Sequence, residues 1–468
     1  MTNAEEVLGL TVTELSARIR ARAVSPVALV EATLARVERL GPRLNCFVTV
    51  TADLAREEAR RAERELAAGR WRGPLHGIPY GLKDLVDTKG IRTTFGARPF
   101  ARRVPDEDAA VVTRLREAGA VLVGKLSMIE LAGALGVTWA NASLNGPCRT
   151  PWDVSRWAGG SSSGCAAAVA AGLVAFAIGT ETIGSLLCPA AFCGVTAHRP
   201  TYGAVPRHGV MTFAASADKV GPLARSARDC ALVLAAVAGH DPRDHSSIAA
   251  PPGLARLDAQ RVKGLRVAVL PFPDEYPVHP ALPIFYEQAL AGLRAAGLVL
   301  ERAALPDLPW RVVTDVIIEA EAAVSFEELI RSGGVKELAD PCHHAHGGRS
   351  YAVESLSTDY VKAQAVRSAM ARDMGAFFGK YDLVVSPNTP ILPPPVDDPL
   401  PGDGGTILQY AGNVLGLPAT ALPMGFLEPG HLPASLQIAG PAHADARVLA
   451  AAAAFQAQTR WHAARPPA

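Results

Sequence analysis

Hydrophobic residues recur at helical spacing through the first seventy positions of the chain. Leu15, Ile19 and Val24 begin this pattern, and the stretch ADLAREEARRAERELAAG that closes it has the alternation of small and charged residues typical of a surface helix. From about residue 74 short apolar runs alternate with amphipathic stretches, as in AAVVTRLREAG followed by AVLVGK. This alternation predicts an α/β sheet covered by helices on both faces. We therefore expect an N-terminal helical segment, residues 1–70, that packs on an α/β domain, residues 71–468.

Two loops interrupt the α/β pattern without defining further domains. The stretch DPRDHSSIAAPPG, residues 241–253, precedes the apolar run LRVAVL and a helical region over 283–297. The second loop, ILPPPVDDPLPGDGG, follows the predicted strand YDLVVSP. We find no repeat of fixed period, so the sequence predicts one continuous α/β domain after residue 70.

Composition and charge narrow the range of partners. The 468 residues include 46 basic and 45 acidic side chains, for a net charge of +1, and 49% of the residues are hydrophobic. A chain so balanced has no strong overall field to recruit nucleic acid. We therefore predict a small-molecule amide-type substrate and no nucleic-acid partner. The N-terminal helices are compatible with a homodimer.

The lack of a signal-peptide pattern and the scattered cysteines both predict an intracellular protein. The start MTNAEEVLGL has acidic residues where a signal peptide has basic ones, and the longest apolar run, Cys165–Gly179, is shorter than the ~18 residues that suggest a membrane span. The seven cysteines are scattered and odd in number, which favours reduced packing residues. We expect a cytoplasmic protein without a membrane partner.

One short stretch has the residue types of a metal site. Cys342 is followed by histidines at 343, 344 and 346, but no carboxylate or distant ligand pattern accompanies them. We predict neither a metal nor a cofactor.

Two further motifs match known signatures only in part. The segment from Gly119 to Lys125 has the spacing of a phosphate-binding loop, yet Leu126 stands where a Ser or Thr must bind magnesium. The run GGSSSG formally contains the nucleophile elbow G-x-S-x-G, with Ser162 as the attacking residue. The preceding PWDVSRWA does not have the pattern of the required apolar strand, and serines also cap helices. We therefore interpret Ser162 and Ser163 as loop-shaping or capping residues.

Three segments become coherent when they are read together: HGIPYGLKDLVDTKG (76–90), GGSSSGCAAAVAAG (159–172) and GTETIGSLLCPAAFCG (179–194). With them the sequence resembles the amidase signature family, and the resemblance extends over essentially the whole chain, to GLPATALPMGF and LPASLQIAGP. The family has a large mixed β-sheet with helices on both faces and a Ser-Ser-Lys triad. The resemblance implies that Lys83 is the base, Ser161 the bridging serine and Ser185 the nucleophile.

The chemistry of such a triad follows from general principles. A serine hydroxyl needs a base within hydrogen-bond reach, and a lysine is a base only when neutral, which burial favours. Leu82 and Leu85 flank Lys83, so we expect its amine to be desolvated; the competing reading is a surface lysine paired with Asp84. We predict that turnover is lost on mutation of Lys83 or Ser185 to Ala.

A tetrahedral intermediate also needs hydrogen-bond donors for its oxyanion. The turn after the predicted strand VAFAIGTE can supply successive backbone N–H groups. We assign the oxyanion hole to the backbone of Thr182, Ile183, Gly184 and Ser185.

The same turn departs from the family pattern. Members often have Asp-Thr-Gly-Gly-Ser-Ile-Arg, whereas this chain has Ile183 in place of a glycine and Leu187 in place of the arginine. Both changes predict a more apolar neighbourhood, and they leave the substrate preference open. The following residues are assigned to the substrate pocket, although buried Trp and Met are more often core: Met128, Trp139, Trp157, Gly159 and Gly160.

Two functions fit these residues. The first is a stand-alone hydrolase that cleaves a non-peptide C–N bond, in an amide, aryl amide, carbamate or urea, through an acyl-enzyme. The alternative is the glutaminase subunit of a tRNA-dependent amidotransferase. Those subunits usually carry an Arg-Arg-Ile type segment before the helix that here is DYVKAQAVRSAM, and this chain has CHHAHGGRSYAVES instead. We therefore favour the stand-alone enzyme.

Overall fold

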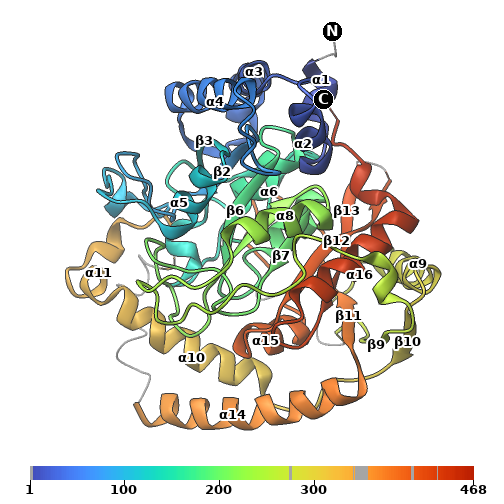
Figure 1. The fold of residues 1–468 in the computed structure, drawn as a ribbon. Coiled ribbons are helices and arrows are strands. Elements are labelled where there is room, and N and C mark those ends of the chain that lie inside the picture. The colour runs from blue at the N-terminus through green and yellow to red at the C-terminus, as the bar shows by residue number, and fades with distance from the viewer. Residues whose placement is uncertain are drawn as a thin grey trace.

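One mixed β-sheet runs through the whole molecule (Figure 1). The computed structural model describes residues 4–273, 277–340, 342, 357–401, 405–428 and 431–467. Within these residues eleven strands pair in the order β1-β3-β2-β6-β8-β7-β12-β13-β11-β9-β10, and β4 and β5 form a separate ribbon. The strands are β1 (Phe47–Val50), β2 (Pro79–Lys83), β3 (Val121–Leu126), β4 (Arg149–Thr150), β5 (Asp153–Trp157), β6 (Phe176–Glu181), β7 (Thr196–Arg199), β8 (Lys219–Ala224), β9 (Arg266–Val269), β10 (Val299–Arg302), β11 (Leu383–Pro387), β12 (Ala419–Leu427) and β13 (Leu432–Ala439).

Helices cover both faces of this sheet, as the alternating pattern predicts. The described helices are α1 (Ala4–Leu8), α2 (Val12–Arg20), α3 (Pro26–Leu44), α4 (Ala52–Ala67), α5 (Ala110–Glu117), α6 (Ser163–Ala170), α7 (Leu187–Cys193), α8 (Ala227–Val237), α9 (Leu282–Ala295), α10 (Trp310–Ser325), α11 (Glu327–Arg331), α14 (Ser357–Lys380), α15 (Ile407–Val414) and α16 (Asp445–Thr459). Successive side chains of a strand face opposite sides of a sheet, so each strand serves two cores. In β6, Phe176 and Ile178 pack in the core that includes α8, α9 and α16, whereas Ala177 packs in the core that includes α6, α10 and α14.

The N-terminal segment is helical except at one place. Ser25 caps α3 by accepting a hydrogen bond from the Ala28 amide, and Pro26 occupies the first turn, where its missing N–H costs nothing. Between α3 and α4, however, residues 47–50 form β1, which pairs antiparallel with β3 at the edge of the main sheet. The helical pattern did not predict this strand. The boundary at residue 70 stays a prediction, although the first segment shares the sheet with the rest of the chain.

Three parallel strands bring the predicted segments to one edge of the sheet. Strand β2 lies between β3 and β6 and runs parallel to both. Their carboxyl ends therefore meet at the same edge, which is where open α/β sheets bind their ligands. Lys83 is the last residue of β2 and Glu181 the last of β6.

Candidate active site

Lys83 is completely buried at the end of β2. Its Nζ donates hydrogen bonds to Ser161 Oγ at 2.6 Å and to Thr180 Oγ1 at 2.9 Å. Burial lowers the pKa of Lys83 from its ordinary 10.5 to about 7, although the carboxylates of Asp218 and Glu181 oppose this shift. The desolvation that we expected from the flanking leucines is confirmed, and a large fraction of the amine is neutral near pH 7.

The carboxylate of the neighbouring Asp84 contacts Thr94 and Lys125 and does not pair with Lys83. It accepts a hydrogen bond from the Thr94 amide at 3.0 Å and lies 4.0 Å from the Nζ of Lys125. Lys125 in turn donates to the Thr93 hydroxyl at 2.7 Å and is buried inside β3. The Lys–Asp surface pair is therefore not formed in the described structure, and Lys125 is not free to bind a phosphate.

The GGSSSG loop is fixed by backbone that only glycine adopts easily. Gly160 has a φ of +44°, and a Cβ built there would lie 2.5 Å from Pro189 Cδ. Ser161 follows with 3% of its surface exposed, and α6 begins at Ser163. Ser162 occupies the N-cap position without a side-chain capping bond; instead its hydroxyl donates to the Thr180 carbonyl at 3.1 Å. Of the two roles that we considered for Ser162, the cap is not formed, because the hydroxyl oxygen accepts the Thr180 amide of β6 at 3.4 Å instead of an amide of α6; the bonds to β6 fix the loop.

The segment before this loop forms a strand, but not the apolar strand that a nucleophile elbow requires. Residues 153–157 form β5, which pairs with β4 rather than with the main sheet. The sequence PWDVSRWA lacks an apolar pattern because β5 is buried only at Trp157, its other residues being partly or fully exposed. A nucleophile elbow requires a strand of the main sheet, so the structure agrees with our rejection of that motif.

Ser185 lies in the turn between β6 and α7. Its carbonyl accepts a hydrogen bond from the Ser162 amide at 3.2 Å, which joins the turn to the GGSSSG loop. Gly184 has a φ of +71°, so the one glycine that the turn retains stands where left-handed backbone is required. Among described residues, the backbone N–H groups of Ile183, Gly184 and Ser185 have no acceptor. They are therefore free to donate to a ligand.

Glu181 anchors the other end of this turn. One carboxylate oxygen accepts the amides of Leu186 and Leu187 at 2.9 and 3.0 Å, and the other accepts Arg199 and Asn413, both at 2.9 Å. Burial is the largest single influence and by itself would raise the pKa of Glu181, but Arg199, Lys219 and the Leu186 amide together hold the pKa below its ordinary value. Arg199 lies on β7 and supplies a positive charge to this turn. Position 187, which is often an arginine in the family, is a leucine in this chain and supplies none.

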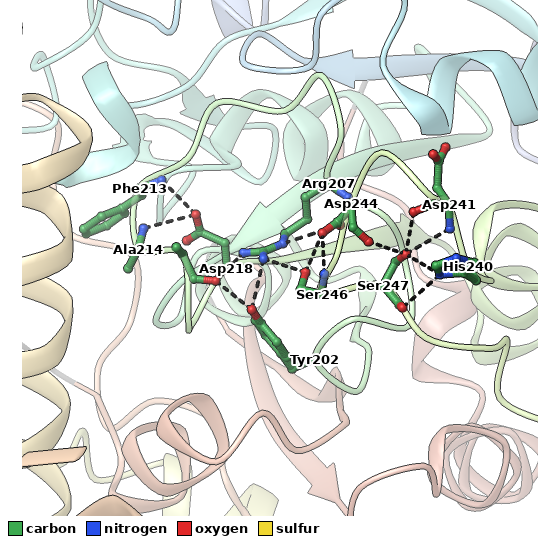
Figure 2. A network of polar contacts seen from close by, with 11 residues as sticks. Tyr202, Arg207, Phe213, Ala214, Asp218, His240, Asp241, Asp244, Ser246 and Ser247 are labelled. Atoms are coloured by element: carbon green, nitrogen blue, oxygen red, sulfur yellow. Dashed lines mark hydrogen bonds and ion pairs between the residues drawn. The ribbon is translucent and has the colours of Figure 1, made fainter.

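Two residues that sequence reasoning missed complete the site. Thr180 contacts Lys83 and Ser162, and Asp218 accepts the Thr182 hydroxyl at 2.6 Å. Figure 2 shows the Asp218 carboxylate also facing the backbone of Phe213 and Ala214. The only sequence signal for Thr180 is that it is one of two polar residues, with Glu181, at the end of the apolar run VAFAIG, and Asp218 gave no signal at all.

The five residues predicted to line the pocket do not form one cluster. Met128 is completely buried in the main core, while Trp157 packs in a small separate cluster with its ring 6.3 Å from that of Phe192. Trp139 is partly exposed, and its amide donates to Asp340 at 3.1 Å. Gly159 approaches Phe192 so closely that a Cβ would lie 2.6 Å from it. The substrate-lining role of these residues and of Gly160 stays a prediction.

The segment with metal-type residues mostly lies outside the described residues, which include Cys342 but not the histidines that follow it. Among described residues, no group of three or more His, Cys, Asp or Glu side chains is placed to hold a metal ion.

Comparison with known proteins identifies the family. Residues 28–449 match the amidase family. The chain belongs to the amidase signature family. The A subunit of the glutamyl-tRNA(Gln) amidotransferase of Moorella thermoacetica is 38% identical over 98% of this chain and 99% of its own length. The amidase signature fold is equally clear in solved structures. The peptide amidase of Stenotrophomonas maltophilia is 33% identical, with a TM-score of 0.81 and 98% coverage of both chains.

A solved A subunit of the same kind of amidotransferase, from Thermotoga maritima, is 28% identical with a TM-score of 0.78 and covers 96% of this chain and 95% of its own. The Moorella and Thermotoga proteins are parts of an amidotransferase of glutamyl-tRNA(Gln). We predicted a small-molecule substrate and no nucleic-acid partner. These relatives contradict that prediction, because subunits of a glutamyl-tRNA(Gln) amidotransferase match this chain over nearly its full length. A net charge near zero excludes a strong overall field, but it does not exclude work within a complex.

The membrane prediction can be checked on the helices that the structure describes. None of them combines the length and the hydropathy that a bilayer crossing requires.

Proposed function

We propose that this chain releases ammonia from a carboxamide through an acyl-enzyme on Ser185, as the glutaminase component of an amidotransferase that acts on glutamyl-tRNA. The hydrogen bond of 2.6 Å between the buried Lys83 and Ser161 is the observation that carries the chemistry. The full-length likeness to the A subunits of such amidotransferases, at 38% identity, supports the assignment to a complex.

In this mechanism neutral Lys83 takes the proton of Ser161 while Ser161 takes that of Ser185. The Ser185 oxygen then attacks the carbonyl carbon, and the oxyanion that forms accepts hydrogen bonds from the backbone amides of residues 182–185. The protons return by the same route to the leaving nitrogen, which departs as ammonia. Water repeats the sequence to hydrolyse the acyl-enzyme and restore Ser185.

A stand-alone amidase is the second candidate. It is favoured by the structural overlap, because the Stenotrophomonas peptide amidase superimposes with a TM-score of 0.81 and the Thermotoga protein with 0.78. The turn with Ile183 and Leu187 is also more apolar than the common family pattern.

One purification and one assay separate the two candidates. A tagged chain from its native host should bring partner subunits with it and release ammonia from glutamine, with the Ser185→Ala variant as the blank. Release from anilides, carbamates or ureas, with glutamine inert and no partner retained, would favour the stand-alone enzyme. Full activity in Ser185→Ala would refute both.

A further inference from the structure

The loop Phe213–Asp218 lies between the nucleophile turn and the outer helices α10 and α14. On its inner side, Asp218 Oδ1 accepts the Thr182 hydroxyl at 2.6 Å. The other oxygen of Asp218 accepts the amides of Phe213 at 2.7 Å and Ala214 at 3.1 Å (Figure 2). One buried carboxylate therefore ties the start of this loop to the side chain of Thr182, three residues before Ser185.

The outer side of the same loop is held by two helices at once. The Ser216 amide donates to Glu321 of α10 at 2.7 Å. The carbonyl and hydroxyl of Ser216 accept hydrogen bonds from the two terminal nitrogens of Arg367 on α14, both at 3.0 Å. Three polar atoms of one residue are thus fixed by charged partners, and hydrogen bonds to charged groups are the stronger ones.

The two helices act on Ser216 as one unit. They pack against each other along the lower part of the molecule (Figure 1), and Tyr360 of α14 donates its hydroxyl to the second oxygen of Glu321 at 2.9 Å. Ala215 gives the loop a separate fixed point, because its carbonyl accepts hydrogen bonds from the Tyr202 hydroxyl at 2.7 Å and from Arg207 at 2.6 Å. The loop is therefore held from both of its sides.

We propose that Glu321 and Arg367 are positioning residues, which set the geometry of the Thr182–Ser185 turn through Ser216 and Asp218. The proposal rests on the proposed function of that turn as nucleophile and oxyanion hole. No member of this chain of contacts needs to touch the substrate. A displacement of the reacting groups by ~1 Å costs a reaction about 100-fold, so a small slackening of the loop is enough to lower the rate.

The experiment compares Arg367→Ala with two matched variants of the same helix. Arg367→Lys keeps the charge, and Arg372→Ala removes an exposed arginine whose guanidinium donates to Ser368 of its own helix. Two rates are measured in the full protein with its partners: steady-state ammonia release, and covalent labelling of Ser185 by a fluorophosphonate probe. Circular dichroism and urea unfolding confirm that each variant is folded.

We expect Arg367→Ala to lower kcat and the labelling rate by ~10-fold, which corresponds to the free energy of about one hydrogen bond to a charged group. KM should change less than about twofold. Arg367→Lys should recover part of the loss, and Arg372→Ala should equal the native protein. A folded Arg367→Ala with native kcat and labelling would overturn the proposal, as would an equal loss in Arg372→Ala.

Glu321→Gln provides the test if Arg367→Ala does not fold. It preserves the shape of the side chain and weakens the bond to Ser216, so kcat should fall ~3-fold with KM unchanged; a native kcat overturns the proposal. Failure of the proposed function is distinguishable: it shows as activity or labelling that survives in Ser185→Ala. If Ser185→Ala loses activity but Arg367→Ala and Glu321→Gln keep the native kcat, only the positioning role is refuted and the proposed function stands.

Discussion

The pH dependence of turnover should follow the protonation of Lys83. Its pKa of about 7, lowered chiefly by burial, means that the neutral amine is the major form above pH 7 and the ammonium the major form below it. Only the neutral amine can take the Ser161 proton. We therefore expect kcat/KM to be lost as the pH falls through about 7 and to reach a plateau near pH 8.

The size of the effect can be worked out from the two pKa values. At pH 8 a lysine with its ordinary pKa of 10.5 is ~0.3% neutral, whereas one with a pKa of about 7 is ~90% neutral. Burial thus increases the active fraction about 300-fold at that pH. Between pH 5.5 and 8 the native enzyme should gain about 30-fold in kcat/KM, since the neutral fraction rises from ~3% to ~90%.

The assay is initial-rate ammonia release at low substrate concentration from about pH 5.5 to 9.5, because kcat/KM reports the pKa of the free enzyme. Asp218→Asn gives an internal check. This variant removes a carboxylate that raises the pKa of Lys83, so the midpoint should move to lower pH even though the rate itself falls. A native profile that is flat across this range, or whose midpoint lies above about pH 9, would show that Lys83 is not the titrating base.

Three further variants test the energetics of the site. Thr180→Val removes the hydroxyl that accepts a hydrogen bond from Lys83 Nζ at 2.9 Å, and it should lower kcat by ~5- to 10-fold in steady-state kinetics. An unchanged kcat would show that the Thr180 hydroxyl does not position the amine. Lys83→Met should abolish turnover yet raise the free energy of unfolding by about 1–3 kcal/mol at pH 7, because a desolvated amine becomes an apolar side chain. Urea unfolding should show this gain shrinking as the pH rises from about 7 to 10.5. Over this window the lysine binds more protons in the unfolded chain than in the folded one, so the unmutated protein itself becomes more stable. A gain that is constant with pH would contradict the lowered pKa of Lys83. Glu181→Ala leaves Arg199 buried without its carboxylate and should lower the free energy of unfolding by about 3–5 kcal/mol, whereas a loss below ~1 kcal/mol would mean that the ion pair does not anchor the turn.

Much of the fold could be predicted from local patterns. The alternation of apolar strands and amphipathic helices predicted a sheet covered on both faces, because strand and helix periods are visible in a window of a few residues. Strands β1 and β5 were missed for the opposite reason. Residues 47–50 form a strand by pairing with β3, and residues 153–157 by pairing with β4, and neither partner is visible in the local pattern.

By itself, the sequence determined the residue types of the candidate site and the three segments that contain them, with Lys83, Ser161 and Ser185 as the predicted triad. The tertiary structure decided what those residues can do. Lys83 has a lowered pKa because β3 and β6 enclose its strand, and Thr180 and Asp218 joined the site only when distant strands met. Arg199 likewise reaches Glu181 from a strand that is not its neighbour in the sheet. Desolvation and hydrogen-bond geometry depend on which groups are brought within a few ångströms, and that is a property of the folded chain alone.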